Sequence, residues 1–174
     1  YICTSGEKLP HYIESITSAH PIESTFLRGI VDALNAEVAL GSVTSLDDGI
    51  SWLGFTYLFT RLCKAPRVYG LDAHDFEADP TLTQRRRQWI TYAANILAQH
   101  QMVEFDLAAG TLRPTNMGRI ASRYYLSHKT VGIFHERLRN NLVEADALSL
   151  MSRAADFDQI PLRESEEEEL TSLL

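Results

Sequence analysis

The chain has 174 residues, of which 45% are hydrophobic and 22% are charged, a composition typical of folded globular proteins and not of disordered segments. It contains neither an apolar run of about 18 residues nor a basic-then-apolar leader. We therefore expect no membrane span and no secretory signal, and we predict an intracellular protein of the cytoplasm, the nucleus or both. Cys3 and Cys63 lack a Cys-x-x-Cys spacing, which predicts two reduced core residues.

The formal net charge of −7 is unevenly distributed along the chain. Residues 1–60 have 2 basic and 7 acidic side chains, residues 61–139 have 12 and 7, and residues 140–174 have 2 and 9. Only the middle segment is basic. A basic segment inside an acidic chain can face a phosphate backbone, or it can contact an acidic neighbouring domain, and the sequence leaves both interpretations open.

The first predicted elements are a short strand and a short helix. Residues 1–4 have the β-branched and aromatic bias of a strand, and a helix is predicted over residues 9–19, where His20-Pro21 ends it. The chain begins without methionine inside this strand and ends inside a predicted helix. We therefore expect it to be part of a larger protein.

A longer helix is predicted from Ser24, a typical N-cap residue, to Gly41, a typical helix stop. Its apolar side chains recur at helical spacing and predict one buried face, formed by Leu27, Ile30, Val31, Leu34 and Val38. Leu34 is therefore a predicted core residue.

The next helix is predicted over residues 45–64, with Ser45 as its N-cap and Gly54 as a break or kink near its middle. Aromatic side chains crowd this segment, and such a helix is typical of a central position with packing on all sides. We place Trp52, Phe55 and Leu58 in the core. Residues 66–80 contain two prolines and four acidic groups, and they are predicted to form a loop.

A helix over residues 81–101 has Trp89, Ile90 and Leu97 on its apolar face. Arg85, Arg86 and Arg87 near its start are candidates for contact with nucleic-acid phosphates. Such a triplet is also compatible with a solvated helix face, or with pairing to the acidic loop that precedes it.

Two alternating runs, residues 103–106 and 111–114, flank a four-residue loop that ends in Gly110, and they predict a β-hairpin. Counting outward from the loop pairs Asp106 with Thr111 and Val103 with Pro114. Helices followed by a two-stranded wing predict a winged-helix domain.

Thr115 is the predicted N-cap of the helix that follows the wing. Tyr124 and Tyr125 are predicted to face the core, while Arg119 and Arg123 lie at i, i+4 on another face. Three more helices are predicted over residues 129–139, 144–157 and 163–174. The fold class is therefore mainly α: a winged-helix domain with a two-stranded wing, followed by the first helices of a helical bundle.

Three stretches resemble a known family: Thr-Asn-Met-Gly-Arg-Ile-Ala-Ser-Arg-Tyr-Tyr at 115–125, Leu-Asn-Ala-Glu-Val-Ala-Leu-Gly at 34–41 and Trp-Leu-Gly-Phe-Thr-Tyr-Leu at 52–58. Together they resemble the region after the second motor lobe of the Ski-type superfamily-two nucleic-acid helicases. The nearest members are the large two-cassette helicases of cointegrator, ribosome quality-control and spliceosomal complexes. The resemblance implies a RecA-like lobe tail at 1–23, a winged helix at 24–126 and the start of the ratchet bundle at 127–174.

The resemblance implies an ATP-dependent RNA or DNA helicase that acts in ribosome quality control, with Mg-ATP bound outside this chain. In such enzymes the winged helix transmits motor movement to the helix that grips the strand. The implied partners are an RNA or DNA strand, other domains of the same helicase and subunits of a cointegrator-type or ribosome quality-control complex. The alternative is a scaffold for protein contacts in an assembly such as the spliceosome, without an enzymatic role.

The sequence has no phosphate-binding loop, acidic box or arginine-finger motif, so we expect no ATP hydrolysis by this chain alone. Its histidines are scattered, and we predict no metal site. The candidate nucleic-acid residues are Arg85, Arg86, Arg87, Arg119 and Arg123. The resembled helicases commonly have histidine at the position of Arg123, which leaves the kind of contact made there open.

Overall fold

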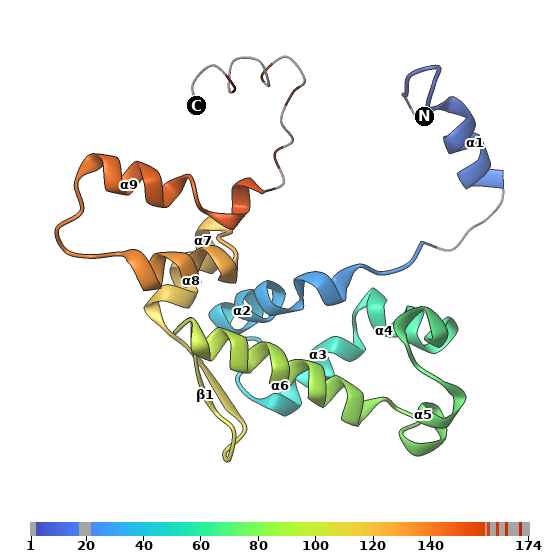
Figure 1. The fold of residues 1–174 in the computed structure, drawn as a ribbon. Coiled ribbons are helices and arrows are strands. Elements are labelled where there is room, and N and C mark those ends of the chain that lie inside the picture. Colours follow the sequence, from blue (N-terminus) through green and yellow to red (C-terminus); the bar gives the residue numbers. More distant parts are fainter. Residues whose placement is uncertain are drawn as a thin grey trace.

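The computed structural model describes residues 3–17, 22–158, 160, 163, 166 and 171. In this part of the chain the structure is mainly α-helical with one small antiparallel sheet, as predicted (Figure 1). Three helices and the hairpin form the central unit: α2 (Ile30–Leu40), α3 (Leu46–Gly54), α6 (Thr83–Gln99), β1 (Val103–Asp106) and β2 (Thr111–Pro114). This is the winged-helix arrangement.

The wing has the predicted register, with Val103 opposite Pro114 and Asp106 opposite Thr111. The segment between α2 and α3 pairs with β2 through a single β-bridge. Leu112 N donates to Thr44 O at 2.8 Å, and Leu46 N donates to Gly110 O at 2.8 Å. Both strands of the wing therefore contact the helices: β1 contacts α6, and β2 contacts the start of α3.

The main core lies between α2, α3 and α6. Its fully buried side chains include Leu34, Val38, Leu53, Ile90 and Leu97, so the prediction for Leu34 is confirmed. A second, smaller core contains Leu58, Leu62, Leu71 and Leu82. Leu58 is thus buried as predicted, although in this second core.

The predicted break at Gly54 is confirmed, since α3 ends there and α4 (Tyr57–Lys64) begins three residues later. Thr56 caps α4 by accepting from Phe59 N at 3.4 Å. Phe55 lies in the turn between the two helices and is 91% exposed, so its assignment to the core was wrong. Trp52, one turn earlier, is partly buried against the main core and packs edge-on against Phe26 with ring centroids 5.6 Å apart.

Residues 66–80 are not all loop: they contain a 3-10 turn, η2 (Pro66–Tyr69), and a short helix, α5 (Ala73–Ala78). Two acidic residues of this segment cap helices. From the sequence alone they are interpreted only as polar loop residues. Asp75 accepts from Asp72 N at 2.8 Å, and Asp79 accepts from Thr83 N and Gln84 N at the start of α6. Such carboxylates accept hydrogen bonds from the N–H groups at a helix start, which have no partner within the helix.

After the wing come α7 (Asn116–Tyr124), α8 (His128–Arg137), α9 (Glu144–Met151) and the 3-10 turn η3 (Ala155–Phe157). The predicted helix over 144–157 therefore ends at Met151. Most of the predicted helix over 163–174 lies outside the described residues. No helix in the described part of the chain is both long and apolar enough to span a membrane.

Near the N-terminus, η1 (Phe26–Gly29) leads into α2, and α1 (Leu9–Thr17) lies apart from the winged helix (Figure 1). None of the residues of α1 is buried, although Leu9, Ile13 and Ile16 form an apolar stripe. Tyr1 and Ile2 of the predicted strand lie outside the described residues, and Cys3 and Thr4 are in no strand. Both cysteines are exposed and free, so their assignment to the core was wrong.

Candidate interdomain joint and nucleic-acid interface

Arg86 is half-buried, and its guanidinium is held between α3, α4 and the start of α6. Its Nη1 donates to Ile50 O at 2.6 Å, its Nη2 donates to Thr81 O at 3.1 Å, and its Cζ lies 4.8 Å from the centre of the Phe59 ring. Gly54 makes room for it, since a Cβ atom there would lie 2.8 Å from Nη1. Arg86 therefore has a structural role, and its contact with a phosphate stays a prediction.

Arg85 and Arg87 remain at the surface of α6. Arg87 Nη2 lies 2.7 Å from Asp47 Oδ1 in an ion pair whose side chains are 49% and 81% exposed. Exposed pairs of this kind contribute about 0–1 kcal/mol and are easily exchanged for another anion. Arg85 donates to Gln88 at 3.3 Å. Both guanidinium groups are thus partly engaged within the chain, and neither is enclosed.

The segment that enters the winged helix is attached to α4 and η2 by an ion pair. Arg61 binds the carboxylate of Glu23 with two hydrogen bonds, Nε to Oε2 at 3.1 Å and Nη2 to Oε1 at 2.6 Å. Tyr69 Oη donates to the same carboxylate at 2.8 Å and accepts from Ser24 N at 2.8 Å. We call these residues the Glu23–Arg61–Tyr69 cluster. The hydrogen bonds from Arg61 and then Tyr69 hold the pKa of Glu23 below its ordinary value of 4.5.

Replacing Glu23 by glutamine should lower the thermal midpoint at neutral pH, because the neutral amide forms weaker hydrogen bonds with Arg61. A carboxyl with a lowered folded-state pKa contributes stability above its ordinary pKa and loses it as the pH falls through the lowered value. The difference between Glu23→Gln and the unchanged chain should therefore shrink in acid. Circular dichroism melts over a pH series measure it, with Asp47→Asn as the exposed-pair control. A difference that stays constant down to strongly acidic pH would contradict this.

The helix after the wing is attached to α2 by small residues and a buried amide. Asn35 Nδ2 donates to Gly118 O at 3.0 Å, and Thr115 Oγ1 accepts from Gly118 N at 3.1 Å while it lies 2.7 Å from Gln101 O. A Cβ atom on Gly118 would lie 2.0 Å from Met102 O. The Thr115–Gly118 turn therefore fits directly against α2 and the end of α6, and we call this the α2–α7 contact.

The opposite face of α7 is exposed. Tyr124 and Tyr125 are 66% and 92% exposed, and the buried positions of the helix are Gly118 and Ala121, so placing the two tyrosines in the core was wrong. The side chains of Arg119 and Arg123 are exposed and make no ion pair or hydrogen bond with the described residues. Arg123 and Tyr125 line one end of a hollow of about 720 Å³ between α2 and α7. Both arginines are available to a partner.

The start of α8 is attached to α2 as well. Asp32 accepts from His128 N at 2.7 Å, and its Oδ1 lies 3.0 Å from His128 Nδ1. His100, at the end of α6, packs against the backbone of α8, since a Cβ atom on Gly132 would lie 2.5 Å from its Cε1. Burial and then the neighbouring His128 lower the pKa of His100, so its neutral form is favoured at this joint.

Sequence reasoning missed most of these joint residues, among them Glu23, Asp32, Asn35, Arg61 and His128. The signal that was available was a polar residue at a helical position next to an apolar stripe, as Asn35 is next to Leu34. Such residues are usually interpreted as solvated. Here each has a partner from a distant part of the chain, and pairing at that range cannot be read from local spacing.

Two families of protein domains match this chain. Residues 23–98 match a family described as a Winged Helix-turn-helix domain, and residues 114–174 match the Sec63 Brl domain. The first match ends before the wing, and the second begins at Pro114, the last residue of the wing. The residues of the α2–α7 contact thus come from both matched regions, with Asn35 in the first and Thr115 and Gly118 in the second.

Similar proteins with curated names are much longer than this chain. The RQC trigger complex helicase SLH1 of Saccharomyces cerevisiae is 44% identical over 172 residues, which is 99% of this chain and 9% of that protein. Activating signal cointegrator 1 complex subunit 3 of Homo sapiens is 39% identical over 173 residues, 99% of this chain and 8% of that protein. The Dictyostelium discoideum protein of the same name has the same identity and coverage. The chain therefore spans about a tenth of the length of these relatives.

Proposed function

Because the chain belongs to the Ski-type helicases, as a segment with a winged-helix region and a Sec63 Brl region, we propose that it transmits movement from the motor lobes to the helices that grip a translocating strand. The whole protein would be an ATP-dependent RNA or DNA helicase. Mg-ATP would be bound by motor motifs outside this chain, and the chain alone would not hydrolyse ATP.

The observation that supports this proposal is that the winged helix is attached firmly on both sides. The Glu23–Arg61–Tyr69 cluster holds the segment that precedes it, and the α2–α7 contact holds the helix that follows it. The bond between Asp32 and His128 extends that second attachment to α8. A displacement of the preceding segment would therefore be passed through a well-packed core to α7 and α8, because packed interiors transmit strain.

We assign the whole protein to ribosome quality control, with a cointegrator-type or related complex as its assembly and the cytoplasm or nucleus as its location. The support is the printed names of the relatives, one a helicase of the RQC trigger complex and others subunits of an activating signal cointegrator complex. The strand contacts would come from the exposed Arg119 and Arg123 on α7 and Arg87 on α6, with the half-buried Arg85 beside them. Arg86 would contribute less, because its guanidinium already donates to Ile50 O and Thr81 O.

The experiment that tests the coupling uses the full-length helicase with Arg119→Glu and Arg123→Glu combined. We expect the number of duplexes unwound per ATP hydrolysed to fall, because charge reversal on the outer face of α7 would disturb its contact with the strand or the neighbouring domain. Stopped-flow unwinding and a coupled ATPase assay measure the two rates. Arg113→Glu on the exposed side of β2 is the matched control and should leave the ratio unchanged. Unwinding and ATP hydrolysis that both match the unchanged enzyme would overturn the proposal.

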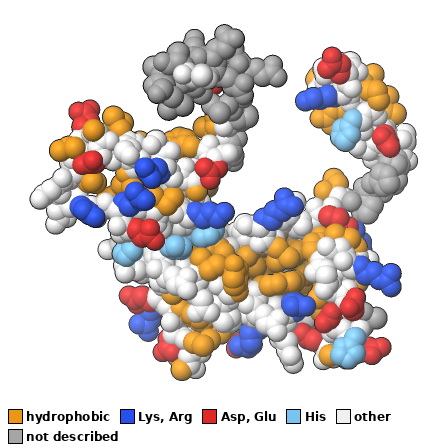
Figure 2. Space-filling view, in the orientation of Figure 1, with side chains coloured by type: hydrophobic (Ala, Val, Ile, Leu, Met, Phe, Trp, Pro, Cys, Tyr) orange, Lys and Arg blue, Asp and Glu red, His pale blue; other side chains and the backbone are white. Residues whose placement is uncertain are grey.

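The second candidate function, a scaffold for protein contacts without an enzymatic role, is favoured by exposed aromatic side chains. Phe55 and Tyr125 are almost fully exposed, and Figure 2 shows hydrophobic side chains gathered in the region where Figure 1 places α2 and α6. Co-purification of complex subunits separates the two functions. Loss of subunits from a Phe55→Ser protein with unchanged unwinding would favour the scaffold.

A further inference from the structure

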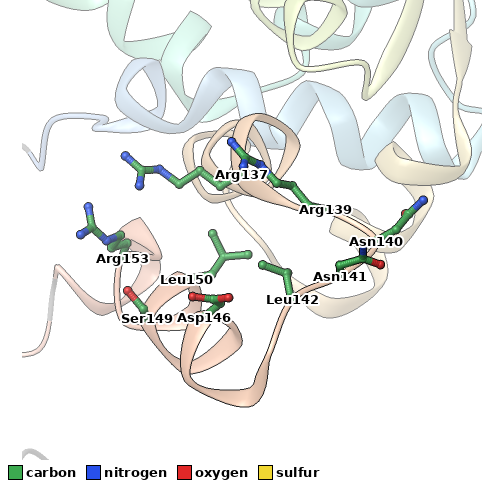
Figure 3. Close-up of a pocket in the computed structure, with 9 residues that line it drawn as sticks. All are labelled: Arg137, Arg139, Asn140, Asn141, Leu142, Asp146, Ser149, Leu150 and Arg153. Carbon is green, nitrogen blue, oxygen red and sulfur yellow. The ribbon is translucent and has the colours of Figure 1, made fainter.

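A hollow of about 570 Å³ lies between the end of α8 and α9, away from the residues of the proposed coupling. Arg137 and Arg139 lie on one side of it and Arg153 on the other, with Leu142 and Leu150 between them (Figure 3). The side chains of Asn140, Asn141, Asp146 and Ser149 complete the lining. Figure 2 also shows basic side chains over α8 and α9 on this face.

The three arginines of this hollow differ from two arginines of the winged helix that have close partners within the chain. Arg61 binds the carboxylate of Glu23 and Arg86 donates to Ile50 O, whereas Arg137, Arg139 and Arg153 make no side-chain hydrogen bond or ion pair with the described residues. Three positive charges without a partner among the described residues therefore lie around one cavity. In a chain with a net charge of −7, such a concentration predicts an anionic ligand.

Asp146 offsets one of these charges, but it forms an ion pair with none of the three arginines. Its Oδ2 accepts from Val143 N at 3.4 Å, so the carboxylate faces the first turn of α9 and stabilises the start of that helix. The net formal charge of the lining side chains is thus positive. An anion could therefore bind the arginines without first breaking an ion pair between them and Asp146.

The lining side chains favour a phosphate ligand over a carboxylate. Arginine guanidinium groups bind phosphate oxygens with pairs of hydrogen bonds, and three guanidinium groups from two sides match the several oxygens of a phosphate better than the two of a carboxylate. The amides of Asn140 and Asn141 add donors and acceptors of the kind that reads nucleotide bases. Leu142 and the buried Leu150 provide an apolar surface for a sugar or base.

We propose that the hollow between α8 and α9 is a phosphate-binding site that takes a phosphodiester group of a single-stranded nucleic acid. Arg137, Arg139 and Arg153 hold the phosphate, and Asn140 and Asn141 contact the attached nucleoside. The site is separate from Arg119 and Arg123 on α7, so it goes beyond the proposed coupling and is tested without ATP or unwinding. A free phosphate compound shares the same chemistry and is distinguished by the probes below.

The test uses the 174-residue chain and three probes: a short labelled single-stranded RNA, inorganic pyrophosphate and a polyglutamate peptide. Arg137→Gln combined with Arg153→Gln should weaken RNA binding by about tenfold or more, because each substitution removes a charged hydrogen-bond donor to the phosphate. The slope of log affinity against log salt should fall by about 0.7 for each arginine removed. Arg113→Gln is the matched control, with the same loss of charge on the exposed side of the wing.

All three arginines substituted in the test are exposed, so circular dichroism melts should show the same midpoint for both variants and the unchanged chain. Loss of RNA binding in the double variant alone, with pyrophosphate as a weak competitor, supports the phosphodiester site. Pyrophosphate that binds as tightly as the RNA supports the phosphate chemistry and identifies a free phosphate compound as its source. The proposal is overturned if none of the three proteins binds RNA, or if all three bind it equally. It is also overturned if polyglutamate binds as well as RNA and pyrophosphate does not compete.

Discussion

Replacing Gly118 by alanine is expected to lower the free energy of unfolding by about 3 kcal/mol or more, the largest effect of any single methyl addition that we predict. The new Cβ atom would lie 2.0 Å from Met102 O and 2.8 Å from Asn35 Oδ1. Overpacking of a well-packed site typically costs about 1–3 kcal/mol, and separation of α7 from α2 would add the loss of the Asn35 hydrogen bond, about 1 kcal/mol. Urea unfolding followed by circular dichroism measures the change.

Gly29→Ala is the matched control for this prediction. Gly29 precedes α2, has a negative φ of −109° and has no atom within 4 Å of the added Cβ. It should therefore leave stability unchanged or slightly increased, because alanine restricts the unfolded chain more than glycine does. Equal urea midpoints for Gly118→Ala and Gly29→Ala would show that α7 does not lie against Met102 as described.

Replacing Trp52 by alanine is expected to cost about 3 kcal/mol, at the lower end of the range for large aromatic residues because the indole is only partly buried. The substitution removes the edge-on contact with Phe26 and opens a space beside the main core. For a protein of this size a loss of about 3 kcal/mol lowers the thermal midpoint by about 6–12 °C. Differential scanning calorimetry measures it.

Phe55→Ala is the control on the same segment. The Phe55 ring is almost fully exposed, and surface substitutions usually change stability by about 0.5 kcal/mol or less. Sequence reasoning treats the two aromatic residues alike, whereas the structure predicts that only Trp52 matters for stability. A larger loss for Phe55→Ala than for Trp52→Ala would mean that the turn after Gly54 is packed differently.

The wing and the helix break could be predicted from sequence because each depends on neighbours in the chain. A hairpin register follows from the loop and the alternation of side chains, so pairing Val103 with Pro114 needed no distant information. Gly54 followed by Thr56 likewise provides a local stop and a local cap. Contacts of this short range determine most of the secondary structure that was predicted correctly.

The exposed face of α7 could not be predicted in the same way, because the helix packs through its small residues. Gly118 and Ala121 lie against α2, and the larger Ile120 and Tyr124 are therefore turned outward. Hydrophobic periodicity assumes that large apolar side chains mark the buried face. Arg86 shows the converse case, since the missing side chain of Gly54 gives a charged residue a half-buried position.

The position of the smaller core determines where a pulling force on the preceding segment first acts. Helix α6 spans about 25 Å, and it joins the smaller core at Leu82 to the main core at Leu97. The Glu23–Arg61–Tyr69 cluster is attached to the smaller core, through α4 and η2, and not to the wing. Tension on the preceding segment would therefore act on the smaller core before it reaches the wing, and α6 would pass it on to the main core against which α7 packs.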